Sequence, residues 1–128
     1  MIRKAADRDL ERIMQIEEIC FSSRWTKEMF LYELHENEFG HFYVLEENQK
    51  IAGFIDFWIT FECCQLANIA VHPSFQRRGY SRCLMDFMIA SAEQEQCETA
   101  LHRADGRNAA LRCDADVEER ADETRSLL

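Results

Sequence analysis

The stretch VHPSFQRRGYS, residues 71–81, joins a strand-like run to a segment with helical periodicity. The preceding residues CQLANIAV predict a strand that Pro73 ends, because proline has no backbone N–H for a sheet hydrogen bond. The following residues RGYSRCLMDFMIASAEQEQ carry apolar side chains at the spacing of a long helix. Gly79 falls between the two, where a positive φ or a close ligand favours a residue without Cβ. The stretch therefore predicts a strand, a turn and a helix.

This predicted turn has the features of an anion site. The first turn of a helix presents backbone N–H groups without intrahelical partners, and these groups and the helix dipole suit phosphate or pyrophosphate. Arg77 and Arg78 add positive charge and hydrogen-bond donors. An arginine-glycine turn that only caps its helix is the alternative, and this segment alone leaves both interpretations open.

The rest of the chain predicts helices followed by antiparallel strands. Residues 2–5 predict a short strand, and apolar side chains at helical spacing predict a helix over residues 7–21 with Asp7 as its N-cap. Thr26 is the predicted cap of a second helix, and two β-rich runs around the polar residues 48–50 predict a hairpin. This order predicts an α+β (mixed α/β) fold. The residues predicted to face the core are Leu10, Ile13, Ile16 or Glu17, and Cys20 in the first helix, and Phe30, Leu31 and Leu34 in the second.

Length and composition limit the classes of protein that remain. The 128 residues suffice for one domain with one core. No apolar run approaches the roughly 18 residues of a membrane span, and the amino terminus lacks the apolar core of a signal peptide, so we expect a cytoplasmic location and no membrane partner. A net charge of −9 argues against a nucleic-acid partner, because phosphate contacts need a cationic face. The cysteines show neither a CxxC pair nor metal-ligand spacing with histidine and are predicted to be buried thiols, with no metal: Cys20, Cys63, Cys64, Cys83, Cys97 and Cys113.

The aromatic residues divide the chain into two parts. The two tryptophans, three tyrosines and nine phenylalanines all lie between residues 21 and 87. Aromatic side chains dominate core burial, so the carboxy-terminal third cannot contribute to a core as the rest does. After His102 the chain has seven acidic and five basic residues, a composition that fits solvated helix or disorder better than packed strands. We therefore predict a folded domain over residues 1–102 and a charged, aromatic-free tail over residues 103–128.

Several motifs in order resemble one family. The segment QRRGYS, residues 76–81, resembles the acetyl-CoA motif Q/R-x-x-G-x-G/A of the GNAT N-acetyltransferases. FSSRWTKEMFLYEL at residues 21–34 resembles the family's F-S-x-P-W-S/T-x-x-x-F-x-x-E-L, and AGFIDFWI and ANIAVHP resemble its central strands. The resemblance covers about residues 2–97. It implies a GNAT-like fold, with a central, mostly antiparallel sheet flanked by helices, whose last helix and strands are missing or altered here.

The resemblance also implies where the substrates bind. The strand ending at Val71 would line the pantetheine arm of acetyl-CoA, with a backbone N–H near Val71 facing the thioester oxygen, and the following turn would hold the pyrophosphate. The acceptor site would be formed by the loop at residues 22–26, with Trp25 as a wall, together with the strand near residues 57–61. For Trp25 plain core packing is an equal alternative, whereas Trp58 is predicted to pack in the core. The implied cofactor-binding residues are Ile69, Ala70, Val71, Gln76, Arg77, Arg78, Gly79, Tyr80, Ser81, Arg82 and Asn108, and the implied substrate-binding residues are Arg24, Trp25 and Glu62.

The catalytic positions of the family are where the sequence departs from it. Counted without gaps, the glutamate that serves the family as base falls on Arg103, and the tyrosine that protonates the leaving thiolate falls on Ala115. The asparagine that touches the cofactor falls on Asn108, so we assign no catalytic residue. We hypothesise that residues from about 98 onward are a shifted reading frame or a replaced terminus, with a natural divergent ending as the alternative.

The resemblance implies an acetyltransferase, but whether the chain is active and which amine it acetylates stay open. The motifs are most similar to family members that acetylate the amino-terminal alanine of a ribosomal protein, by direct attack of the amine on acetyl-CoA without a metal. One alternative is a catalytically weak or inactive acetyl-CoA-binding module or truncated fragment. The other is a small-molecule amine acetyltransferase, because fold does not fix substrate. The sequence gives no oligomeric state.

Overall fold

A computed structural model describes residues 1–60 and 63–95 of the chain. Four strands form one sheet in which each strand pairs antiparallel with the next in chain order. This arrangement confirms the α+β class and the antiparallel sheet. The strands are β1 (Ile2–Lys4), β2 (Gly40–Glu47), β3 (Lys50–Thr60) and β4 (Cys63–Val71); the helices are η1 (Asp7–Asp9), α1 (Leu10–Cys20), α2 (Lys27–His35), η2 (Pro73–Phe75) and α3 (Tyr80–Gln94).

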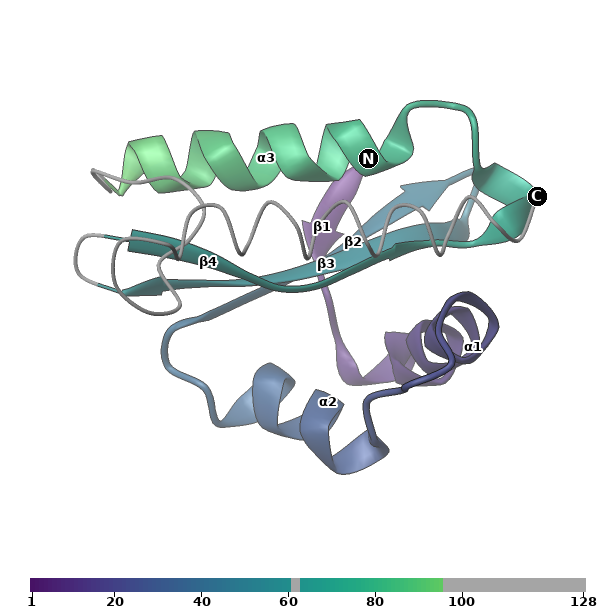
Figure 1. Cartoon of the computed structure of the whole chain (residues 1–128), viewed down its shortest axis with the longest axis horizontal. Coiled ribbons are helices and arrows are strands. Elements are labelled where there is room, and N and C mark those ends of the chain that lie inside the picture. The colour runs from purple at the N-terminus through teal and green to yellow at the C-terminus, as the bar shows by residue number, and fades with distance from the viewer. Residues whose placement is uncertain (61–62, 96–128) are drawn as a thin grey trace.

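The sheet is the middle of three layers. The helices α1 and α2 lie against one face and α3 lies against the other (Figure 1). Successive residues of β3 supply the two cores, because side chains alternate between the faces of a sheet. Phe54 packs with the α1 and α2 side, and Ile55 packs with the α3 side. Both apolar faces of the sheet are therefore covered.

The predicted helices are present, with one wrong cap. Thr26 caps α2 as predicted, since its hydroxyl oxygen accepts a hydrogen bond from the Met29 backbone N–H at 3.2 Å. Asp7 does not cap α1, which begins at Leu10 after one turn of 3-10 helix. Just before α1 the Asp9 carboxylate forms the local contacts instead. It accepts a hydrogen bond from the Ala6 N–H at 2.8 Å and pairs with Arg3 at 2.9 Å. This ion pair joins β1 to the residues just before α1, and helical periodicity does not reveal it.

The β2–β3 hairpin turns through two residues in the left-handed region. Asn48 has φ of 51° and Gln49 has φ of 66°, and Lys50 already belongs to β3. Positive φ at both central residues matches the natural right-handed twist of a two-residue hairpin. The predicted hairpin is confirmed, with a turn one residue shorter than expected.

Strand β4 contains a bulge in its pairing with β3. Asp56 pairs with Asn68 but the next residue, Phe57, pairs with Leu66, so Ala67 has no partner on β3. A bulge bends its strand and redirects the side chains beside it. The bulge precedes the residues that the family resemblance assigns to the cofactor.

Gly53 is where β3 and β4 approach most closely. A Cβ at this position would lie 2.6 Å from the Ala70 carbonyl oxygen and 3.2 Å from the Val71 Cα, both backbone atoms. We expect Gly53→Ala to lower the free energy of unfolding by about 2–3 kcal/mol, because the strands must separate to relieve the overlap. Urea denaturation measures this loss. Gly40→Ala is the control: its nearest contact is 3.2 Å, so a loss as large at Gly40 would contradict the explanation.

Some sequence predictions need correction or lie outside the described residues. Cys20 and Cys64 are buried as predicted, whereas Cys63 is half-buried and Cys83 is exposed on α3, because Cys83 lies at the edge of the helix face that packs on the sheet. Among residues 1–60 and 63–95, no helix is long and apolar enough to cross a membrane. In the same residues no group of histidine, cysteine and carboxylate side chains could hold a metal ion. The proposed tail and four site positions lie outside the described residues: Glu62, Arg103, Asn108 and Ala115.

Candidate functional site

The turn before α3 presents uncapped backbone donors to open space. Gly79 occupies the N-cap position with φ of 78°, and a Cβ there would meet no heavy atom within 4 Å. The Cys83 N–H donates to the Gly79 carbonyl at 3.0 Å and is the first helical hydrogen bond. The N–H groups of the three residues between them have no intrahelical acceptor, and no described side chain caps them. These donors are free to bind an anion.

Side chains within the turn hold its shape. The Gln76 amide donates through Nε2 to the Val71 carbonyl at 3.1 Å, and its Oε1 is buried without a partner among the described residues. The Arg78 guanidinium lies over the Phe75 ring, 5.4 Å from the centroid. Arg77 has φ of 68°, a conformation that costs a non-glycine residue about 1–2 kcal/mol. Such strain is typical of functional turns.

His72 fixes the start of the turn on the sheet. Its backbone N–H donates to the Ala52 carbonyl at 2.7 Å, and its Nδ1 accepts from the Ser74 N–H at 3.0 Å. Burial, and then the positive charge of Arg12, lower the pKa of the His72 imidazole. A lowered pKa favours the neutral ring, which is the form that can accept through Nδ1.

The strand β4 leads directly into this turn. It is the last strand in the sheet order, so its outer edge has no strand neighbour within the described residues. Ile69, Ala70 and Val71 are buried and pair on the inner edge with β3. The Val71 carbonyl accepts from Gln76 and from the Cys20 Sγ at 3.3 Å. The ten residues predicted to bind the cofactor and described by the structure thus form one strand end and one turn.

Trp25 lies at the boundary between core and surface. Its ring is half-buried and lies 5.3 Å from the Phe30 ring, and it also lines a surface pocket of about 480 Å³ between α1 and the loop after it. Arg24 lines the same pocket, is exposed, and pairs with Glu18 at 3.6 Å. The two interpretations of Trp25 are therefore compatible, because the half-buried ring packs near Phe30 and also lines the pocket.

A set of buried polar side chains lies on the α1 and α2 side of the sheet, and sequence reasoning missed it. Glu17 accepts two hydrogen bonds, from the Trp25 backbone N–H and from the Asn68 Nδ2, each at 2.9 Å. Glu33 accepts from the Trp58 indole and from the Asn37 amide at 3.0 Å. Two signals pointed to it: helical periodicity placed residue 16 or 17 inward, and Glu33 is the glutamate of the motif at residues 21–34.

Asp56 is the unusual member of this set. It is 0% exposed, and neither carboxyl oxygen has a hydrogen-bond partner among the described residues. Burial, and then the neighbouring Glu33 carboxylate, raise the pKa of Asp56 to about 10. The Asp56 carboxyl is therefore protonated and neutral at pH 7.

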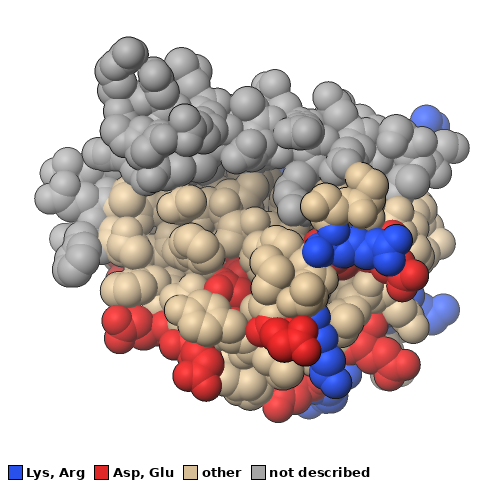
Figure 2. Space-filling model, turned by 60° about the horizontal axis from the view of Figure 1, so that its bottom comes forward, with Lys and Arg blue, Asp and Glu red and all other residues tan. Residues whose placement is uncertain are grey.

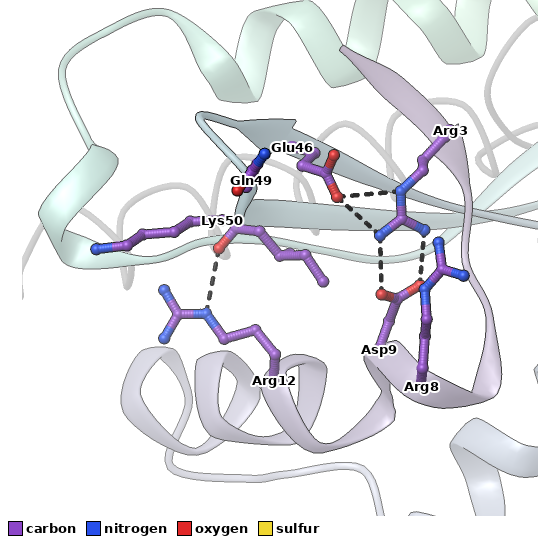
Figure 3. Close-up of a pocket in the computed structure, with 8 residues that line it drawn as sticks. Arg3, Arg8, Asp9, Arg12, Glu46, Gln49 and Lys50 are labelled. Atoms are coloured by element: carbon purple, nitrogen blue, oxygen red, sulfur yellow. Dashed lines mark hydrogen bonds and ion pairs between the residues drawn. The ribbon is translucent and has the colours of Figure 1, made fainter.

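A second pocket is lined by residues whose contacts join the strands to α1. It measures about 540 Å³ and lies between β1, the start of α1 and the β2–β3 turn (Figure 3). Inside it the Arg3 guanidinium donates to Asp9 at 2.9 Å and to Glu46 at 3.0 Å, and Arg12 Nε donates to the Ile51 carbonyl at 3.2 Å. The Arg3 hydrogen bonds hold the pKa of Asp9 below its usual value. These contacts join β1, β2 and α1, and none of the predicted site residues lines the pocket.

Surface charge on the helical face is mixed. Figure 2 shows acidic and basic side chains interspersed where α1 and α2 cover the sheet. A mixed surface lacks the single-sign field that steers a polyanion over a distance. Anion binding is better explained by the local donors of the Gly79 turn than by this face.

Comparison with known proteins gives the fold and the turn their context. A model of the acetyltransferase (GNAT) family matches residues 10–113. The "Putative ribosomal protein bS18-alanine N-acetyltransferase" of Bacillus subtilis (strain 168) is 36% identical over 80 residues, 62% of this chain. The ribosomal protein bS18-alanine N-acetyltransferase of Escherichia coli (strain K12) is 28% identical over 102 residues, 80% of this chain. This chain spans 52% of the length of the Bacillus protein and 68% of the Escherichia coli protein.

A solved structure agrees with these matches. The ribosomal-protein-S18-alanine N-acetyltransferase from Escherichia coli superposes with a TM-score of 0.73 at 25% identity, over 94% of this chain and 75% of that one. The family match over residues 10–113 spans both β4 and the Gly79 turn. The chain belongs to the GNAT family of acetyltransferases.

Proposed function

We propose that the protein transfers an acetyl group from acetyl-CoA to the α-amine of an amino-terminal alanine on a ribosomal protein. The observation that carries the donor half is the Gly79 turn, with its left-handed glycine and uncapped helix N-terminus at the end of β4. The acceptor half is supported by the names of the Bacillus subtilis and Escherichia coli relatives, both bS18-alanine N-acetyltransferases.

Acetyl-CoA would bind along β4 and across the turn. The N–H groups at the start of α3, together with Arg77 and Arg78, would hold the pyrophosphate. The open outer edge of β4 at Ile69 to Val71 would bind the pantetheine arm through backbone hydrogen bonds. A backbone N–H near Val71 would face the thioester oxygen, where negative charge develops as the amine attacks.

The acceptor would approach from the α1–α2 loop. Trp25 offers an accessible ring face beside a pocket that Arg24 also lines. The exposed carboxylates that line this pocket are Glu11 and Glu18, and Glu18 pairs with the Arg24 guanidinium, so the pocket suits a peptide that carries positive charge. Glu62 stays part of this proposal from the family resemblance alone.

The chemistry needs a neutral amine and a leaving thiolate. A C–N bond forms as the C–S bond breaks, the amine loses one proton to solvent, and the coenzyme A thiolate takes one up. An α-amine with a pKa near 8 is about 10% neutral at pH 7, whereas a lysine near 10.4 is neutral to about one part in 2,500. An amino-terminal acceptor can therefore react slowly without a dedicated base. A positioned base would add about 10²- to 10⁴-fold.

The test is acetylation of a peptide that begins with alanine. We expect mass spectrometry to show one added acetyl group in the presence of acetyl-CoA, at a rate that rises about tenfold from pH 6 to pH 7 as the neutral amine fraction rises. The same peptide with a blocked amino terminus is the control and stays unmodified. Saturable acetyl-CoA binding without any product would instead support the inactive binding module, and turnover of small amines alone would support the small-molecule enzyme.

A further inference from the structure

Glu17 joins the two halves of the proposed site through one buried carboxylate. Its Oε1 accepts from the Asn68 side chain on β4, and its Oε2 accepts from the Trp25 backbone N–H in the loop after α1. We infer that Glu17 is a positioning residue, an inference that rests on the proposed function. It holds the acceptor loop against the acetyl-CoA strand, so that a change in the position of one changes the position of the other.

Burial strengthens the hydrogen bonds that Glu17 accepts. Glu17 is 1% exposed and Asn68 is 0% exposed, so water cannot readily replace a lost hydrogen bond between these two side chains, whereas the hydrogen bond to the Trp25 N–H is part-buried. A buried donor left without its acceptor destabilises the folded arrangement. The loop and the strand are therefore held in one relative position.

The strand end of the link lies at the bulge. Asn68 follows the unpaired Ala67 and precedes Ile69, the first residue assigned to the pantetheine arm. Opposite Asn68 on β3 stands Asp56, which is neutral at pH 7 because of its raised pKa. A neutral Asp56 adds no negative charge beside the Glu17 carboxylate. Any movement of Asn68 when acetyl-CoA binds would reach the Trp25 backbone N–H through the Glu17 carboxylate.

The loop end of the link lies at the proposed acceptor wall. Trp25 N–H is fixed by Glu17 while the Trp25 ring packs on Phe30, so both the backbone and the side chain are held from the core side. Transfer needs the amine and the thioester carbon about 3–3.5 Å apart, and a misplacement of about 1 Å can cost 10²-fold. A side chain that positions the wall without touching a substrate can therefore control turnover.

Glu17→Gln tests the link with almost no change of shape. The amide can accept one hydrogen bond but must turn its NH₂ toward another donor, so one of the two contacts is lost. We expect kcat for the alanine peptide to fall about 10- to 100-fold, while the Kd for acetyl-CoA stays within about threefold, because the Gly79 turn is built separately. Glu38→Gln makes the same chemical change on an exposed residue and should leave both constants unchanged.

A double variant restores the pair with its polarity exchanged. In Glu17→Gln with Asn68→Asp, the glutamine oxygen can accept from the Trp25 N–H and its NH₂ can donate to the new carboxylate. We expect this double variant to regain most of the lost kcat. A Glu17→Gln protein with wild-type kcat, or a double variant no better than the single one, would overturn the inference.

Amide hydrogen exchange tests the link without requiring catalysis. We expect the Trp25 N–H to exchange at least tenfold faster in Glu17→Gln than in the wild type, while the Phe54 N–H in β3 exchanges as before. Acetyl-CoA should slow Trp25 exchange in the wild type but not in Glu17→Gln. Equal slowing in both proteins would overturn the link even if the wild type acetylates peptide, whereas an unreactive wild type with the expected exchange would contradict only the proposed function.

Discussion

Gly79→Trp is expected to weaken acetyl-CoA binding by more than 100-fold while the protein stays folded. A Cβ at this position meets no heavy atom within 4 Å, so the larger side chain starts without a clash. The indole would fill the space in front of the uncapped N–H groups of α3 and exclude a pyrophosphate. The left-handed φ of 78° adds about 1–2 kcal/mol of strain, which lowers stability without unfolding a typical domain.

Calorimetric titration of acetyl-CoA into both proteins measures this effect. Ala90→Trp is the control, since it places the same indole on an exposed position of α3, about 16 Å along the helix from Gly79. We expect the control to bind as the wild type does. A folded Gly79→Trp protein with wild-type affinity would remove the turn from the cofactor site.

The sequence predicted the turn and the sheet because both depend on local signals. Pro73 and Gly79 mark the end of a strand and the start of a helix wherever they occur in this order, and the structure places β4, η2 and α3 accordingly. Two runs rich in β-branched and aromatic residues on either side of a polar turn likewise predicted the antiparallel hairpin of β2 and β3. Such signals need no knowledge of distant residues.

The buried polar set could not be predicted because its partners are distant in the sequence. Glu17 and Asn68 are separated by 51 residues, and nothing in the spacing of either segment indicates that they meet. Helical periodicity offered Ile16 or Glu17 for the inner face, and both are buried. The choice of an apolar residue over an acid was reasonable from burial statistics, but the acid is tolerated because both of its oxygens are hydrogen-bonded.

Some residues predicted to lie in the core are only half-buried at its edge. Leu31 and Leu34 pack against the core only at its edge, whereas Glu33, between them, is buried on the Trp58 indole. Trp58, predicted to pack in the core, is itself only half-buried for the same reason. An indole has one polar atom that needs a partner, so its position is decided by that partner as well as by apolar contact.

Asp56→Asn is expected to raise the free energy of unfolding strongly at pH 7. The gain should appear only above the pH at which a free aspartate ionises. Burial and the Glu33 carboxylate raise the pKa of Asp56 to about 10 in the folded state, from its ordinary value of 3.8. Between these values the folded chain binds a proton that the unfolded chain releases, so wild-type stability falls as pH rises. The fall is about 1.4 kcal/mol per pH unit from this group, or about 4 kcal/mol between pH 4 and pH 7.

Asparagine at position 56 removes this proton linkage because it has the shape of protonated aspartate and does not ionise. Urea denaturation of both proteins at pH 4, 5.5 and 7 should show a stability difference that grows in favour of Asp56→Asn by about 4 kcal/mol over the range. Glu38→Gln, an exposed acid-to-amide change, should show no such growth. Glu33→Gln in the wild-type background should reduce the slope, since it removes the second cause of the raised pKa of Asp56. A difference between Asp56→Asn and wild type that stays constant with pH would mean that Asp56 is ionised in the folded protein beside the Glu33 carboxylate, and would contradict the raised pKa.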